Sequence, residues 1–152
     1  YFPKDIRLNK IATRCMKIAQ SGQYNFSRCM KRNEIVAARM AETEFLDEAV
    51  HMIYLLNRKY KPFYKWFHRR LKELPILGEK TYMMIENLVK FSFDDVDKKI
   101  EIIEEICRDI ITELKRQKII KNVKSDFLLD YGPEIQRSIA DEKLRNWSPW
   151  LD

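Results

Sequence analysis

The chain has 152 residues, of which 45% are hydrophobic and 34% charged, and its formal net charge is +6. This balance excludes a disordered chain, and the length suits one domain with a sizeable core. Only three glycines and five prolines occur, which disfavours a β-sandwich or barrel and favours long helices. No apolar run approaches the roughly 18 residues of a membrane helix, so no membrane partner is expected. The first residue is Tyr1 rather than Met, which suggests a domain taken from a longer protein.

The first predicted helix runs from about Lys4 to Ala19, and Pro3 suits its start. Gly22 leaves its continuation to Lys31 open. A glycine inside a helix costs about 1 kcal/mol relative to alanine, and it can equally mark a break. The apolar stripe of this helix consists of Ile6, Leu8, Ile11, Ala12, Cys15, Ile18 and Ala19.

The clearest helical pattern spans about Asn33 to Asn57, with Asn33 as its predicted cap. Its inward residues are predicted to be Ile35, Ala38, Phe45, Ala49, Met52, Ile53 and Leu56. Four acids, Glu42, Glu44, Asp47 and Glu48, also lie on this helix. Carboxylates can bind magnesium or act as a base, but on a long helix they more simply form the solvated face.

The sequence pattern after Asn57 also predicts helices. Pro62 opens an aromatic and basic helix to about Leu74. The next runs from Glu79 to Lys90, with Tyr82, Ile85, Leu88 and Val89 inward. Ser92 or Asp94 caps a long helix from Asp95 to Gln117. Ser125 begins a helical turn that ends at Gly132, and Pro133 begins the last helix, with Ile135, Ile139 and Leu144 inward. We therefore predict an all-α antiparallel bundle of about five to seven helices over residues 1–146, followed by an irregular tail over residues 147–152.

The charge is unevenly distributed. Eight basic residues and one acid lie between Lys4 and Arg32, and seven basic residues and no acid lie between Arg58 and Lys72. One interpretation is an electropositive face directed at an anion; the other is that basic and acidic helices pair. Three cysteines without paired spacing and only two histidines disfavour a disulfide framework and a metal site. They favour a reducing cytoplasm.

Two segments carry the densest ligand-binding chemistry. The first, residues 20–32, reads QSGQYNFSRCMKR. If it is helical, one face carries Gln20, Tyr24, Arg28 and Arg32, with Gln23 and Asn25 beside it. Arginines on adjacent turns can grip a phosphate or carboxylate, and a tyrosine can stack on a ring. The alternative is a solvated basic face.

The second segment, residues 55–66, reads LLNRKYKPFYKW and places Asn57, Tyr60, Lys65 and Trp66 close together. A lysine and a tryptophan at a helix start, beneath a tyrosine, can hold a phosphate and a base. The alternative is a structural corner in which Pro62 fixes the turn and Trp66 packs.

These segments, together with the opening string YFPKDIRLNKIA, resemble the bacterial family called domain of unknown function 4037, from Tyr1 to about Arg145. The resemblance implies the C-terminal helical half of a nucleotidyltransferase-like enzyme, similar to the helical domain of antibiotic nucleotidyltransferases. It implies that this half packs against an N-terminal nucleotidyltransferase-like domain of the same protein. The full-length enzyme would use a nucleoside triphosphate and magnesium.

In such enzymes a G-S pair followed by aspartates binds the metal and nucleotide, and this chain has no G-S pair. The resemblance therefore implies that this chain holds no metal or cofactor itself and contributes substrate-binding residues. These are Gln23, Tyr24, Asn25, Arg28, Asn57, Tyr60, Lys65 and Trp66, and their ligand would be small and anionic, such as a nucleotide. Two alternatives from other classes are a non-enzymatic basic module that binds nucleic acid and a protein-interaction bundle that uses the aromatic helix.

Overall fold

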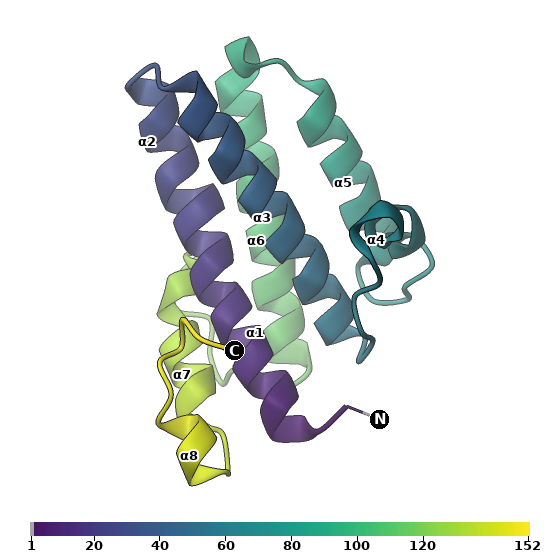
Figure 1. Ribbon diagram of the computed structural model, residues 1–152, viewed down its shortest axis with the longest axis vertical. Coiled ribbons are helices and arrows are strands. Elements are labelled where there is room, and N and C mark those ends of the chain that lie inside the picture. Colours follow the sequence, from purple (N-terminus) through teal and green to yellow (C-terminus); the bar gives the residue numbers. More distant parts are fainter. Residues whose placement is uncertain (1) are drawn as a thin grey trace.

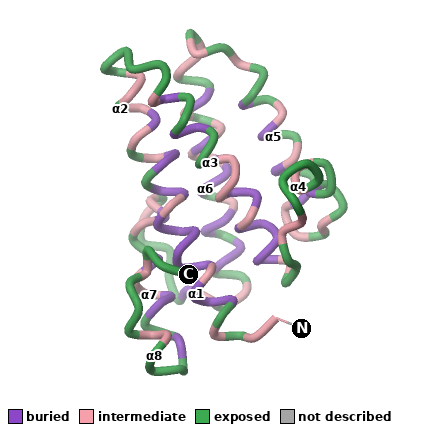
Figure 2. Tube along the Cα trace, in the orientation of Figure 1, coloured by how far each residue is buried: buried purple, intermediate pink, exposed green. Residues whose placement is uncertain are grey.

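The computed structural model describes residues 2–152, and every regular element in that range is helical. Tyr1, where the predicted domain begins, lies outside the described residues. The centre of the bundle is formed by α1 (Lys4–Ile18), α3 (Ile35–Leu56) and α6 (Val96–Arg116), with α5 (Gly78–Lys90) alongside (Figure 1). Their buried faces meet between the long helices (Figure 2). The predicted all-α bundle is confirmed.

The helix that begins at Lys4 does not break at Gly22. It passes through a π-helical stretch, η1 (Ala19–Asn25), and continues as α2 (Phe26–Lys31). A Cβ atom at position 22 would collide with the ring of Phe45 on α3, so glycine lets the two helices approach closely here. The predicted continuation to Lys31 is therefore the correct alternative.

Asn33 ends α2 and does not cap α3. Its φ of 57° is left-handed, a conformation that asparagine tolerates, and the amide of Glu34 donates to the carbonyl of Cys29 at 2.9 Å. The chain thus makes a C-terminal capping turn at Asn33 before α3 starts at Ile35. The predicted N-cap is wrong because the residue is used by the preceding helix.

Two shorter elements, one on each side of α5 in the sequence, lie between α3 and α6. The aromatic helix α4 (Tyr64–Leu71) begins two residues after Pro62, so that proline precedes the helix rather than opening it. The 3-10 turn η2 (Phe93–Asp95) leads into α6, and the Ser92 hydroxyl accepts a hydrogen bond from the Asp94 amide at 3.0 Å. Ser92 therefore caps η2, whereas the N-cap residue of α6 is Asp95, whose side chain makes no capping hydrogen bond. Neither of the two predicted residues caps the long helix itself.

The predicted last helix is divided in the structure. A 3-10 turn, η3 (Leu128–Asp130), precedes α7 (Gly132–Arg137), and α8 (Glu142–Arg145) follows after a break. The Asp141 carboxylate accepts from the Leu144 amide at 2.8 Å and so starts a new helix. Gly132 opens α7 instead of ending a turn. Residues 147–152 contain no regular element, and the end of this stretch contacts α1 through the carbonyl of Leu151 (Figure 1).

Most predicted core residues are buried, but Ile6, Ile35 and Val89 are 45%, 40% and 56% exposed. Each lies in the first or last turn of its helix. Periodicity gives the direction of a side chain around the helix axis, but it does not say whether a neighbouring helix extends that far.

The acids of α3 do not form a simple solvated face. Glu42 is 4% exposed, and its carboxylate accepts from the ammonium of Lys99, 1% exposed, at 2.9 Å. The same ammonium donates to the carbonyl of Leu88 at 2.8 Å. This buried pair joins α3, α5 and α6.

Candidate functional site

Within the first predicted segment, Gln23 has a structural role. Its amide nitrogen donates to the Glu104 carboxylate at 2.9 Å and to the carbonyl of Asp126 at 2.7 Å, and its amide oxygen accepts from the Leu128 amide at 3.0 Å. Both ends of the amide are therefore used to fasten the loop before η3 to the π-helical stretch. Both N–H donors of this side chain are used and its oxygen already accepts one hydrogen bond, so the side chain is held in its structural position and is not free to turn toward a ligand.

Tyr24 and Arg28 share an exposed face, as the four-residue spacing predicted. The guanidinium of Arg28 donates to the Tyr24 hydroxyl at 2.7 Å and lies 4.6 Å from the centre of its ring. Tyr24 is 49% exposed. Asn25, the neighbouring candidate, is partly buried. This pair remains open to solvent at the end of the bundle where α2 lies.

In the second segment, Asn57 also has a structural role. Its side chain donates to the carbonyls of Ile53 and Ile76 at 2.8 and 2.9 Å and accepts from the Ile76 amide at 2.9 Å. It thereby ties the end of α3 to the loop before α5. Lys65 and Trp66 are exposed on α4, where the guanidinium of Arg69 lies 5.8 Å from the tryptophan ring.

The two predicted segments do not lie together in one binding site. Residues 20–32 pack beside the start of α3, whereas residues 57–66 follow its end. The 22 residues of α3 separate them by roughly 33 Å at 1.5 Å per residue. Figure 1 shows α2 and α4 at opposite ends of α3. A single pocket containing all eight predicted residues is therefore incompatible with this fold.

The structure instead forms a basic cleft where three helices end. It has a volume of about 710 Å³ and lies between the start of α1, the residues after α3 and α6, and α7. We call it the basic cleft. Its six cationic lining residues are Lys4, Arg7, Arg58, Lys118, Lys121 and Arg137.

The charge of the basic cleft is largely uncompensated. Its acidic lining residue, Glu134, is already paired with Lys124 at 3.2 Å. Within residues 2–152 the exposed lining cations form no ion pair; these are Lys4, Arg58, Lys118, Lys121 and Arg137. Burial lowers the pKa of Arg7, and the positive charge of Arg58 lowers that pKa further. The lowered pKa shows that the two positive charges repel each other, and a bound anion would relieve this repulsion.

Two of these cations occupy strained backbone positions. Arg58 and Lys118, which directly follow the C-cap residues of α3 and α6, have φ values of 57° and 59°. Such left-handed positions after a helix most often carry glycine, because a Cβ atom is penalised there. Both residues line the basic cleft. Strained positions of this kind cluster at functional sites, which favours a role for the two side chains beyond helix termination.

Arg7 forms the floor of the basic cleft and is 7% exposed. Its guanidinium donates to the carbonyls of Leu55 and Leu56 at 2.8 and 3.4 Å and to the Gln117 amide oxygen at 2.7 Å. The residue thus satisfies carbonyls at the end of α3, which would otherwise lack partners. It holds α1, α3 and the end of α6 together beneath the exposed cations.

An aromatic pair borders the same region. Phe2, which lines the basic cleft, stacks on Tyr60 with ring centres 4.4 Å apart and an interplanar angle of 13°. Tyr60, a residue of the predicted set, thus contacts a lining residue of the cleft, and Arg58, two positions earlier in the chain, lines the cleft itself. The second segment does contribute to a cationic site, but through Arg58 rather than Lys65.

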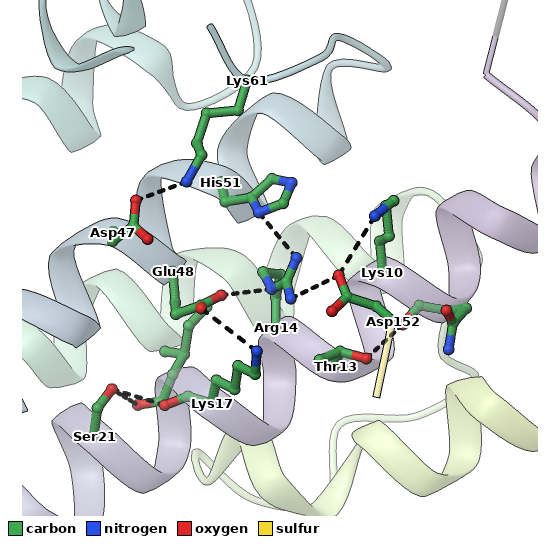
Figure 3. A network of polar contacts seen from close by, with 12 residues as sticks. Lys10, Thr13, Arg14, Lys17, Ser21, Asp47, Glu48, His51, Lys61 and Asp152 are labelled. Carbon is green, nitrogen blue, oxygen red and sulfur yellow. Dashed lines mark hydrogen bonds and ion pairs between the residues drawn. The ribbon is translucent and has the colours of Figure 1, made fainter. Parts of the chain in front are cut away.

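A second polar centre lies further along α1, about two helical turns beyond Arg7 (Figure 3). Arg14 contacts the Glu48 carboxylate at 2.5 Å, the Asp152 carboxylate at 2.8 Å and Nδ1 of His51 at 2.9 Å. Burial, followed by the nearby positive charges of Arg14, Lys61 and Lys10, lowers the pKa of His51 to about 3. Burial also raises the pKa of Glu48.

Sequence patterns missed both centres for the same reason. Residues of the basic cleft come from four separate stretches, and each cation looks like an ordinary surface residue when it is considered alone. The one available signal was the position of Arg58 directly after the end of the predicted α3 helix, where the chain must turn. Arg14 lies on the apolar side of α1, and no pattern indicates which acid will reach it.

The described residues offer neither a metal-binding cluster nor a membrane-spanning helix. Asp95 and Asp97 have the D-x-D spacing, but no group of three or more histidine, cysteine or acidic side chains suited to a metal ion occurs in residues 2–152. None of the helices described is both long and apolar enough to cross a membrane.

Part of the chain matches the model of a known family. Residues 1–67 match the sequence model of a family described as domain of unknown function (DUF4037). The match covers α1 to the start of α4 and both predicted segments, but it is shorter than the resemblance inferred from the sequence strings. No curated protein and no solved structure matches the chain.

Proposed function

Because residues 1–67 match the model of the DUF4037 family, we propose that this chain is the substrate-binding helical half of a nucleotidyltransferase-like enzyme. In this proposal the basic cleft binds the phosphate groups of the nucleotide or its acceptor. An N-terminal domain of the same protein would bind the catalytic metal and the nucleoside triphosphate. The chain alone would therefore bind ligand without turning it over.

The observation that carries the proposal is the set of unpaired cations around one cleft. Five exposed basic side chains face about 710 Å³ of space, and Glu134, the acidic lining residue, is already paired. A polyphosphate carries several negative charges and can contact several cations at once, whereas a single carboxylate cannot. The stacked pair of Phe2 and Tyr60 at the edge offers a flat apolar surface to a heterocyclic ring.

The left-handed residues allow a test in which binding and stability change in opposite directions. Lys118→Gly and Arg58→Gly each remove a cleft cation but relieve an unfavourable backbone conformation. We expect each variant to be more stable by about 1 kcal/mol and to bind phosphate ligands roughly fivefold more weakly. Damage to the fold would instead lower both quantities.

Asn33→Gly is the matched control, because Asn33 has the same left-handed backbone but lies at the far end of α3. The assays are urea unfolding and calorimetric titration with ATP and with inorganic triphosphate. We expect the control variant to keep the wild-type affinity. Equal affinities in wild type, Lys118→Gly and Arg58→Gly would remove the basic cleft from the proposal.

The main competing function is nucleic-acid binding, and the same proteins can test it. A phosphate-contacting nucleic-acid module loses affinity steeply as salt rises, because bound counterions are released. One contrary outcome is that the chain binds a single-stranded RNA with a steep salt dependence and shows no detectable binding of ATP or triphosphate. That result would reject the nucleotide-binding proposal in favour of a nucleic-acid-binding module.

A further inference from the structure

The last residues of the chain contact α1 in a specific manner. We call residues 147–152 the C-terminal strap. The carbonyl of Leu151 accepts from the side-chain amide of Asn9 and the hydroxyl of Thr13, both at 3.0 Å. The carboxylate of Asp152 lies 2.8 Å from the guanidinium of Arg14 and 3.5 Å from the ammonium of Lys10 (Figure 3). Side chains of α1 therefore contact two features of the strap: a backbone carbonyl and the acidic side chain of the next residue.

The receiving side chains are held in place by contacts outside the strap. The side chain of Arg14 is 4% exposed and is also fixed by Glu48 and His51. Asn9 is 3% exposed and donates to the Gln136 side chain at 3.2 Å. Because these partners belong to the bundle, the site keeps its shape when the strap leaves. Such preorganisation lowers the entropic cost of binding a ligand.

The strap itself buries little apolar surface. Leu151 is 59% exposed, Trp147 is 51% exposed and Trp150 is 37% exposed. The attachment therefore depends on the polar contacts of Leu151 and Asp152 more than on apolar burial. Polar contacts at a partly solvated surface exchange readily with water and with competing groups, so the strap can be displaced.

We propose that the face of α1 formed by Asn9, Lys10, Thr13 and Arg14 is a recognition site for an acidic peptide segment, and that Leu151 and Asp152 occupy it in this structure. The ligand is a stretch of chain in which an aspartate follows an accessible backbone carbonyl. This site is distinct from the basic cleft and does not depend on the proposed function.

Charge favours an acidic occupant. When Asp152 is withdrawn, Lys10, Arg14 and Lys17 are opposed in this network by Glu48, which contacts Arg14 and Lys17. A neutral peptide would leave this excess of positive charge uncompensated beside a buried guanidinium. An acidic peptide restores the arrangement in the structure, with two carboxylates on Arg14.

A competition experiment on the full chain tests the site. The probe is a fluorescent peptide with the sequence of residues 148–152, SPWLD, blocked at both ends so that terminal charges play no part. The variant Asp152→Asn weakens the chain's own strap, and exposed Asp97→Asn on α6 is the matched control. We expect the peptide to bind Asp152→Asn at least about tenfold more tightly than wild type or the control, measured by fluorescence anisotropy.

Two further arms decide whether recognition is specific. A peptide with asparagine in place of its aspartate should bind Asp152→Asn about tenfold more weakly. Adding Thr13→Val to Asp152→Asn should weaken the acidic peptide, because one donor to the backbone carbonyl is lost. No binding of the acidic peptide to Asp152→Asn, or equal binding of both peptides, would overturn the proposal.

Discussion

The environment of His51 leads us to expect that the folded protein loses stability in mild acid. The imidazole is partly buried on α3, and its Nδ1 accepts a hydrogen bond from the guanidinium of Arg14 at 2.9 Å. A protonated imidazole would lose that bond and place a second cation beside the first. Burial and the positive charges of Arg14, Lys61 and Lys10 accordingly lower the pKa of His51 to about 3, and the opposing charge of Asp152 does not compensate.

The sign and size follow from proton linkage. In the unfolded chain the histidine pKa is about 6.5, so acid protonates the unfolded state first and pulls the equilibrium toward it. Stability from this group is complete above about pH 6.5 and falls as the pH decreases toward 3. Between pH 7 and pH 5 the expected loss in the free energy of unfolding is about 2 kcal/mol.

The variant His51→Asn isolates this effect, because the asparagine oxygen can accept from Arg14 but does not titrate. Urea unfolding of both proteins at pH 7 and pH 5 gives the free energies. Other groups, including Glu48, titrate in both proteins and largely cancel in the comparison. We expect the wild type to lose about 2 kcal/mol more than His51→Asn over this interval.

A direct titration checks the cause. The chain has two histidines, His51 and His68, so the imidazole resonances can be assigned from the spectrum of His51→Asn. The His51 resonance should remain in its neutral position at pH 5. Titration of His51 near pH 6.5, or equal acid sensitivity of the two proteins, would refute the reasoning.

Two core contacts give further predictions. Lys99→Met leaves the Glu42 carboxylate buried without its cation and should destabilise the fold by about 3–5 kcal/mol. Lys99→Met with Glu42→Gln should recover part of this loss in urea unfolding; no recovery would exclude the buried charge as its cause. Gly22→Ala should destabilise by about 1–3 kcal/mol because the new methyl group collides with Phe45. Adding Phe45→Leu should relieve the collision, whereas a stabilising Gly22→Ala would show that helix propensity dominates.

The helices were predictable because their signals are local. The stripe of α3 repeats over many turns, and a helix that buries one such face must pack against others. Helix ends were less predictable. The stop between α7 and α8 and the left-handed turn at Asn33 depend on which of two adjacent helices uses a given capping residue.

The candidate site was predictable only in part. The spacing of Tyr24 and Arg28 correctly placed them together, because four residues make about one helical turn. Gln23 and Asn57 were expected to face a ligand, but loops from distant parts of the chain use their amides. Polar side chains of this kind suit a ligand and a loop equally well, and only the packed structure distinguishes the two.

The sequence by itself determined the helical class, the approximate helix bounds and the concentration of basic residues in two segments. These properties depend on residue type and on spacings of three or four positions. The tertiary structure decided which charges meet. It placed the two segments at opposite ends of α3, brought Arg58 together with Lys118 in the basic cleft, and set Asp152 against Arg14. Electrostatic interactions fall off with distance in space and not along the chain, so partners far apart in sequence are fixed only when the helices pack.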